Sequence, residues 1–161
     1  MTGVTEKITS VDPDSEPARA MLDALWGEIQ RRYGFTAPNP MGADLFAEPP
    51  GRFWLATVDD IPVGSVGITA HTETALELDA MYVTPEVRGT GTAQRLLAAA
   101  EEYASSLGYQ AIRLRTGEPQ PESVRFYEKA GYRRIPRFGK WLEDDTAWCF
   151  EKALSTPAET G

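Results

Sequence analysis

Two acidic side chains and one tyrosine are the groups in this chain best suited, by type and spacing, to move protons. Glu77 and Asp79 lie two residues apart within the segment 75–83, whose apolar residues predict a β-strand. A carboxylate beside an incoming ammonium can take its proton, so that the neutral amine attacks a carbonyl. Tyr127 can donate a proton to a leaving group, because a phenol titrates at about pH 10. We rank Glu77 first and Asp79 second as the base; a solvent-facing acid and a core tyrosine remain the structural alternatives.

The same strand predicts which side chains share a face. Side chains alternate with a period of two along a strand, so the two carboxylates should project together. One face would carry Glu77, Asp79, Met81 and Val83, and the other Leu76, Leu78, Ala80 and Tyr82.

A glycine-punctuated turn follows this strand and opens a helix. Residues 88–94 read Arg-Gly-Thr-Gly-Thr-Ala-Gln, and the glycines let the backbone turn tightly and approach a ligand. The free N–H groups and the dipole of the following helix favour an anion such as pyrophosphate. A dinucleotide fingerprint would need glycine in place of Gln94, and a Walker loop would need a Gly-Lys-Ser/Thr string that this sequence lacks. The remaining alternative is an ordinary glycine-rich turn.

The periodicity of apolar residues predicts the helices and strands that position the candidate acids, the tyrosine and the glycine turn. Helical spacing predicts helices over 15–33, 92–107 and 121–130, with a turn of helix near 42–47. The order of helices and strands predicts an α+β fold, in which helices cover both faces of a mixed sheet. We expect one domain over 1–154 and a mobile tail over 155–161. Strand patterns cover 53–58, 62–70, 75–83, 110–116, 132–135 and 146–152, with a hairpin turn at 59–61.

Composition excludes several classes of protein. The 161 residues carry a formal net charge of −8, which argues against nucleic-acid binding. The sequence has no membrane-length apolar run and no secretory leader, so we expect a soluble cytoplasmic protein with no membrane partner. One cysteine and one histidine exclude an internal disulfide and argue against a metal site. Residues 1–60 hold 10 acids and 5 bases, which slightly favours a small cationic partner.

Four isolated residues lie outside the strand 75–83 and the glycine turn. Cys149 lies in an apolar run and reads as a core thiol. His71 reads as an exposed turn residue and as a remote base candidate. Phe138 and Trp141 flank a glycine turn, where they would either line an acceptor pocket or pin a loop to the core.

Two motifs resemble those of the GNAT superfamily of N-acetyltransferases. Residues 88–93 read Arg-x-x-Gly-x-Ala, which resembles the acetyl-CoA pyrophosphate loop. Residues 120–132 read Gln-x-x-Ser-x-x-x-Tyr-x-x-x-Gly-Tyr, which resembles the block Asn-x-x-Ala-x-x-x-Tyr-x-x-x-Gly-Phe, with Gln and Ser in place of Asn and Ala. The resemblance covers roughly residues 52–135. The segments 116–120 and 134–141 look like a bacterial subgroup of small-molecule or unassigned acetyltransferases.

The resemblance implies a fold, a donor and a mechanism. The fold would be a mostly antiparallel sheet of six to seven strands with about four helices, and the protein a homodimer. Acetyl-CoA would lie across a splay between 75–83 and 110–116 and transfer its acetyl group directly to a primary amine in a ternary complex, without a metal. Tyr127 would be the general acid, and Glu77, with Asp79 behind it, the base. The cofactor-binding residues would be Met81, Tyr82, Val83, Arg88, Gly89, Thr90, Gly91, Thr92, Ala93, Gln120 and Ser123.

The acceptor and two rival functions stay open at this point. A non-catalytic acyl-CoA-binding sensor would keep the phosphate turn without turnover, and a nucleotide-binding module ranks last. The acceptor would be shaped by 34–52 and by the loop after 134, where the family pattern is weakest. A small-molecule amine is favoured over an antibiotic, a polyamine or a protein amine.

Overall fold

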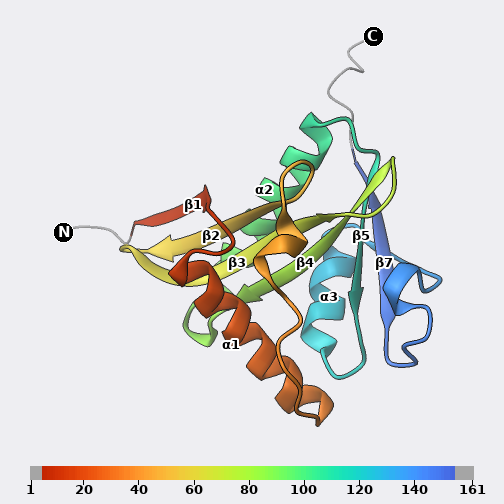
Figure 1. Ribbon diagram of the computed structural model, residues 1–161, viewed down its shortest axis with the longest axis horizontal. Coiled ribbons are helices and arrows are strands. Elements are labelled where there is room, and N and C mark those ends of the chain that lie inside the picture. The colour runs from red at the N-terminus through yellow and green to blue at the C-terminus, as the bar shows by residue number, and fades with distance from the viewer. Residues whose placement is uncertain (1–4, 155–161) are drawn as a thin grey trace.

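A seven-stranded mixed sheet forms the centre of the molecule in the computed structural model, which describes residues 5–154. The strands follow the order β1-β2-β3-β4-β5-β7-β6, and every pairing is antiparallel except that of β4 with β5. Figure 1 shows the sheet with helices in front of and behind it. The strands are β1 (Glu6–Ser10), β2 (Arg52–Val58), β3 (Ile61–Ala70), β4 (Ala75–Val83), β5 (Ala111–Thr116), β6 (Arg133–Ile135) and β7 (Trp148–Ala153).

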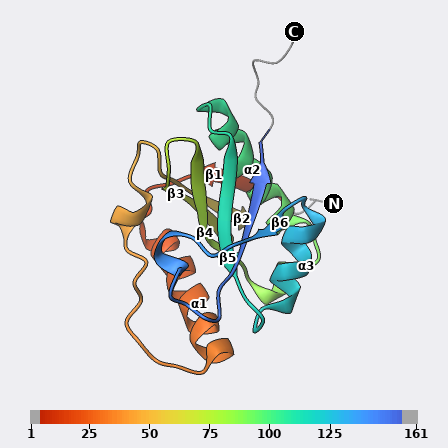
Figure 2. The same cartoon turned by 90° about the vertical axis from the view of Figure 1, so that its right-hand side faces the viewer.

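Helices cover both faces of the sheet. The helix α1 (Glu16–Tyr33) packs on one face, where its Leu22 and Leu25 meet Phe46 and Phe53. The helices α2 (Thr92–Ser106) and α3 (Pro121–Lys129) bury their apolar residues in the larger core on the other face. The turned view in Figure 2 separates α1 from α2 and α3. Three short 3₁₀ helices complete the described elements: η1 (Ala43–Phe46), η2 (Pro85–Val87) and η3 (Gly139–Trp141).

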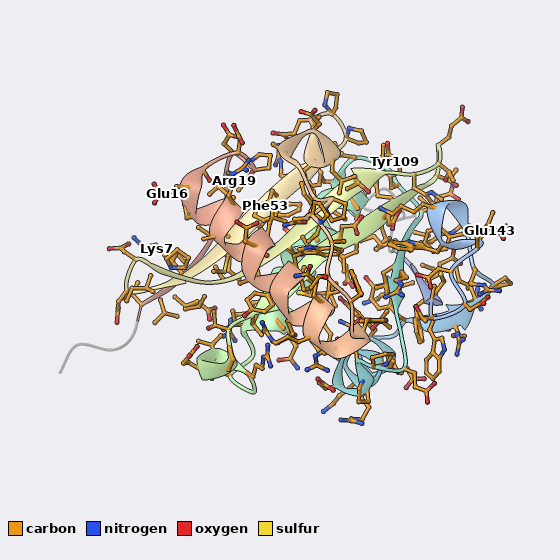
Figure 3. All side chains as sticks on the ribbon, turned by 60° about the horizontal axis from the view of Figure 1, so that its bottom comes forward. Lys7, Glu16, Arg19, Phe53, Tyr109 and Glu143 are labelled. Atoms are coloured by element: carbon orange, nitrogen blue, oxygen red, sulfur yellow. The ribbon has the colours of Figure 1, made fainter. Side chains whose placement is uncertain are left out.

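Hydrophobic burial explains why these segments fold together. Phe53 is fully buried against α1, whereas Lys7, Glu16 and Glu143 are exposed at the periphery (Figure 3). Removing apolar surface from water contributes about 25 cal/mol per Å². Apolar faces on both sides of one sheet therefore require a helical cover on each side.

The predicted fold class is confirmed, and the predicted elements match the structure to within two residues. The strand β1 was missed because its sequence, Glu-Lys-Ile-Thr-Ser, contains one apolar residue, and it pairs only at the sheet edge with β2. The hairpin turn is present, with positive φ at Asp59 and Asp60. The expected tail at 155–161 lies outside the described residues. In the part of the chain that the structure describes, no helix is long and apolar enough to cross a membrane.

A β-bulge in β4 makes the predicted face alternation wrong beyond Asp79. The register with β3 shifts between Ser65 and Gly67, and Ala80 has a φ of +58°. Ser65 Oγ donates a 2.8 Å hydrogen bond to the displaced Ala80 carbonyl. Because a bulge inserts one residue, it exchanges the two faces of the strand that follows. Ala80 and Tyr82 consequently pack with the α1 core, whereas Met81 and Val83 join Leu76 and Leu78 in the α2 core.

The strands β4 and β5 separate soon after they begin. Their parallel pairing is limited to three positions and ends at Glu77 opposite Arg113. Beyond these residues, Leu78 to Met81 on β4 and Leu114 to Thr116 on β5 line the two sides of a single cavity. The splay implied by the family resemblance is thus present.

Candidate active site

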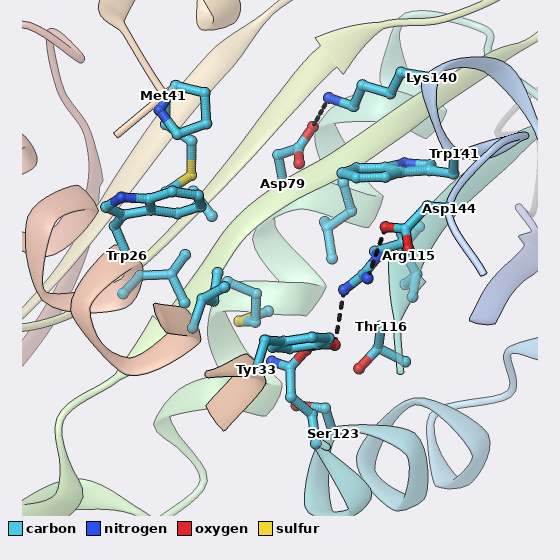
Figure 4. Close-up of a pocket in the computed structure, with 18 of the residues that line it drawn as sticks. Trp26, Tyr33, Met41, Asp79, Arg115, Thr116, Ser123, Lys140, Trp141 and Asp144 are labelled. Atoms are coloured by element: carbon cyan, nitrogen blue, oxygen red, sulfur yellow. Dashed lines mark hydrogen bonds and ion pairs between the residues drawn. The ribbon is translucent and has the colours of Figure 1, made fainter. Parts of the chain in front are cut away.

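A cavity of about 760 Å³ occupies the splay between β4 and β5. Its walls combine the bulged part of β4, the end of β5, one side of α1, the start of α3 and the segment around η3 (Figure 4). The apolar part of the wall comes mainly from α1 and the segment after it, while the charged part comes from β4, β5 and the segment 140–146. The apolar residues on that wall are Leu25, Trp26, Ile29, Phe35, Pro40, Met41 and Leu45, and the charged residues are Asp79, Arg115, Lys140 and Asp144.

The two candidate carboxylates occupy different positions. Asp79 lines the cavity. Glu77 is 5% exposed and does not line it, and its Oε2 accepts a 2.9 Å hydrogen bond from Trp141 Nε1. Lys140 Nζ lies 3.6 Å from Asp79 Oδ2 and 3.7 Å from Glu77 Oε2. The expectation that both acids project together is correct, but only Asp79 is open to a ligand in the cavity.

The electrostatics of Asp79 suit a proton acceptor. Burial raises the pKa of Asp79, and the neighbouring charge of Glu77 adds to the shift, so that the pKa reaches about 7 despite the opposing effects of Lys140 and Thr69. A buried carboxylate loses hydration and repels a second negative charge, and both effects favour the protonated form. A group with a pKa near the working pH can accept a proton and release it again.

Tyr127 of α3 also lines the cavity. The residue is 6% exposed, and its ring packs edge-on against Phe126 and Tyr132. Its hydroxyl has no hydrogen-bond partner among the described residues. Burial raises the pKa of Tyr127 well above its ordinary value, and the charge of Asp79 raises it further. The phenol is therefore protonated at neutral pH and able to donate.

The glycine turn opens α2 with its amide groups free of a side-chain cap. Gly91 is the N-cap residue, with a φ of +91°, and Gly89 has a φ of +83°. No side chain caps this helix start, so the first-turn N–H groups can bind an anion. Thr92 is buried, and its hydroxyl donates instead to Glu6 Oε2 at 2.7 Å. The turn therefore offers backbone donors together with an inward-turned threonine side chain.

The Arg88 side chain is held by α1 and by the end of β4. Its Nη2 pairs with Glu28 Oε1 on α1 at 2.7 Å, and its Nε donates to the Val83 carbonyl at 3.2 Å. Glu28 also pairs with Arg32, which in turn pairs with Glu122 at the start of α3. This chain of charges ties α1 to the glycine turn and to α3.

Gln120 and Ser123 both line the cavity. Gln120 is the N-cap residue of α3, and its Oε1 accepts a 2.8 Å hydrogen bond from the Tyr33 hydroxyl. The side-chain oxygen of Gln120 is thus held by α1, and this position links the two helices.

Sequence reasoning missed a partly buried cation on the cavity wall, Arg115. The Arg115 side chain is 12% exposed; its Nη1 donates to the Tyr33 hydroxyl at 2.8 Å, and its Nη2 donates to Asp144 Oδ2 at 3.0 Å and to Thr146 Oγ1 at 2.7 Å (Figure 4). Its guanidinium also lies 5.2 Å from the centre of the Trp141 ring. The available signal was an arginine alternating with buried residues on β5, which does not identify partners on α1 or near η3.

The four isolated residues separate into two groups. Trp141 lines the cavity, as one interpretation expected. Phe138 instead packs with Cys149, which is fully buried, as predicted for a core thiol. His71 is half-buried and stacks on Phe138 at 4.8 Å, and burial lowers its pKa. Within residues 5–154, no cluster of three or more acidic, histidine or cysteine side chains is arranged to hold a metal.

Comparison with known proteins agrees with this geometry. The model of the acetyltransferase (GNAT) family matches residues 11–132 of the chain. The chain belongs to this family. It is therefore an acyltransferase, and its α+β fold is the family's fold.

Individual relatives extend the comparison. An IAA acetyltransferase of Azospirillum brasilense is 33% identical over 134 residues, which cover 83% of this chain and 86% of that protein. A proposed acyl-CoA N-acyltransferase from Klebsiella pneumoniae has the same fold, with a TM-score of 0.78 and 22% identity over 93% of this chain and 98% of that one. An aminoglycoside 6'-N-acetyltransferase, solved in complex with coenzyme A, aligns with a TM-score of 0.72 and 18% identity over 92% of this chain and 97% of that one.

Proposed function

We propose that this acyltransferase moves the acetyl group of acetyl-CoA onto a primary amine by direct attack in a ternary complex. The observation that carries the proposal is that Asp79 of β4 and Tyr127 of α3 line the same cavity at the splay. The pKa of Asp79, raised to about 7, suits a proton acceptor, and the raised pKa of Tyr127 suits a donor.

The donor would lie with its pyrophosphate on the backbone of residues 88–93 and its thioester beside the bulge in β4. A bulge leaves the extra residue out of the strand pairing, so a backbone N–H of the Ala80–Val83 stretch can polarise the thioester oxygen. Gln120 and Ser123 would contact the pantetheine arm from the start of α3.

Asp79 and Tyr127 would then carry out the two proton transfers of the reaction. Asp79 takes a proton from the acceptor ammonium, and the neutral amine attacks the thioester carbon. The carbon–sulfur bond breaks, and the departing sulfur takes the proton of Tyr127. Direct attack is supported by the position of Cys149, which is fully buried in a separate core cluster, and burial raises its pKa. A covalent acyl-cysteine route would need a thiol at the cavity.

The acceptor we propose is a small primary amine on an apolar body. The acidic residues that line the cavity are Asp79 and Asp144, so the acidic N-terminal third contributes none of them. That third contributes apolar surface instead, including Trp26 and Phe35, whose rings pack edge to face at 5.5 Å. An apolar wall favours an apolar substrate body through burial, and Asp79 binds its ammonium.

The proposal is tested by thiol release from acetyl-CoA across a panel of primary amines. Apolar and aromatic amines should give the highest kcat/KM, ahead of polyamines, aminoglycosides, amino acids and lysine peptides. Tyr127→Phe should lower kcat by about tenfold or more. Tyr132→Phe is the matched control: it removes a neighbouring hydroxyl whose partner is Glu101, and that hydroxyl does not face the cavity. A wild-type chain that binds acetyl-CoA and is inert to every amine would favour the sensor alternative.

A further inference from the structure

The cavity contains an amine of its own, at the tip of Lys140. The chain has four lysines, at 7, 129, 140 and 152, and Lys140 is the one that lines the cavity. Its Nζ lies within 4 Å of both Asp79 Oδ2 and Glu77 Oε2. Figure 4 shows the Lys140 side chain extending over the cavity to Asp79.

We propose that Lys140 is an internal acceptor, so that in the absence of a free amine the enzyme acetylates its own Lys140. This inference rests on the proposed function, because it uses the same donor and the same Asp79 and Tyr127. Lys140 Nζ occupies the place beside Asp79 that the ammonium of an external acceptor must take, and an external amine must therefore displace it.

The environment of Lys140 allows it to reach the donor. The side chain is 46% exposed and is carried by the short helix η3. Leu142, which follows η3, is 57% exposed. A flexible four-carbon stem anchored at the cavity edge keeps the amine at a high effective concentration near any thioester bound in the splay.

The reaction balances as an ordinary acetyl transfer. Asp79 takes one proton from the Lys140 ammonium, and the neutral Nζ attacks the thioester carbon of acetyl-CoA. A nitrogen–carbon bond forms and the carbon–sulfur bond breaks; sulfur takes the Tyr127 proton, and a second amine proton is lost to water. The products are Nζ-acetyl-Lys140 and free coenzyme A, and Tyr127 regains its proton from solvent.

Acetylation would change the charge of the site. The ammonium that bridges Glu77 and Asp79 becomes a neutral amide, so it can no longer pair with either carboxylate. A modified enzyme would therefore bind a cationic acceptor without competition from Lys140 Nζ.

The other lysines provide an internal reference for spontaneous acetylation. Lys129 is exposed at the end of α3. Lys152 Nζ donates to Glu101 Oε1 at 3.0 Å, and Lys7 is exposed in β1. None of these three lines the cavity, so acetyl-CoA in solution would modify them without help from Asp79.

The test incubates the full chain with acetyl-CoA and no added amine, and follows each lysine by peptide mass spectrometry. Lys140 should gain one acetyl group about ten to a hundred times faster than Lys129. The rate constant should not change when the protein is diluted, because the step is intramolecular. Asp79→Asn should slow the acetylation of Lys140 to the rate seen at Lys129, and it should leave the acetylation rate of Lys129 unchanged.

Four outcomes would overturn the inference. Equal rates at Lys140 and Lys129 would exclude assistance by the site, and a rate constant proportional to protein concentration would exclude an internal acceptor. Thiol release with free amines and an unmodified Lys140 would overturn self-acetylation alone. A chain that acetylates neither a free amine nor Lys140 would overturn the proposed function as well. Lys140→Arg, which keeps the cation, should remove the added acetyl group and leave only background labelling at the other lysines.

Discussion

The proposed donor site and the cavity proposed for the acceptor are built in different ways. The proposed donor site is a turn of consecutive residues, 88–93, which opens α2 and lies outside the lining of the cavity. The acceptor side joins α1, β4, β5 and η3 through contacts such as Trp141 to Glu77 and Arg115 to Tyr33, which are 64 and 82 residues apart in sequence. A site made of backbone depends on local conformation, whereas a site made of side chains depends on packing. Substitutions should therefore act differently on the two sides.

The largest effect is expected from the carboxylate that lines the cavity. Asp79→Asn removes the proposed base and should lower kcat/KM for an accepted amine by about 10²–10⁴-fold. Glu77→Gln keeps a hydrogen-bond acceptor for Trp141 Nε1. It should lower kcat/KM less, by about tenfold, because it disturbs only the positions of Trp141 and Lys140. Steady-state kinetics of the two variants show which acid contributes more to kcat/KM. A larger loss of kcat/KM in Glu77→Gln would identify the buried glutamate as the base.

The pH dependence should carry the same residue's signature. Asp79, whose pKa is about 7, faces Glu77, Lys140, Thr69 and Tyr127. It must be ionised to accept a proton, so kcat should rise with pH and fall to about a tenth of its plateau at pH 6. A profile of kcat against pH for the wild type and for the residual activity of Asp79→Asn checks this. If kcat of Asp79→Asn still rises with pH around pH 7, the titrating group must be a residue other than Asp79.

On the donor side, a single methyl group in the turn should weaken acetyl-CoA binding. Gly89 and Gly108 both have a φ near +85°, and a Cβ at either position meets nothing within 4 Å. Gly89→Ala and Gly108→Ala therefore share a strain of about 1 kcal/mol. Only Gly89→Ala should also raise the KM for acetyl-CoA, by about fivefold, because Gly108 lies at the other end of α2. Equal effects of both variants on KM would contradict a backbone-built donor site.

The last effect concerns the free energy of unfolding, and it runs opposite to the effect on activity. The pKa of Asp79 is about 7 in the folded chain and has its ordinary value of 3.8 without the fold. Between these values the folded chain binds more protons, so the free energy of unfolding falls as pH rises from about 4 to 7. Asp79→Asn cannot ionise and should be more stable than the wild type at pH 8 by up to about 4 kcal/mol, the free-energy equivalent of this shift. The difference should disappear near pH 4.

Urea unfolding at pH 4 and pH 8 measures this difference. Asp145→Asn is the control, because the Asp145 side chain is 99% exposed and a surface pair contributes little. A destabilised Asp79→Asn at pH 8 would mean that the Lys140 pairing outweighs burial and the charge of Glu77.

Consecutive residues determined much of this protein in advance. The α+β class, the α-helices, the strands other than β1, the glycine turn and the family all follow from periodicity and short motifs, because each depends on neighbours in sequence. Glycines at 89 and 91 predict a turn whatever lies elsewhere in the chain. The edge strand β1 escaped because its stability comes from pairing with β2 rather than from its own pattern.

Only the tertiary structure determined which residues line the cavity. A bulge at Ala80 exchanges the faces of β4, and it becomes visible only when the register with β3 is known. Glu77 and Asp79 are equivalent in sequence, yet Trp141 covers one and the cavity exposes the other. Arg115 and Lys140 acquire their positions from partners on other elements. Burial and charge set the chemistry of these groups, and both are properties of the packed molecule rather than of local sequence.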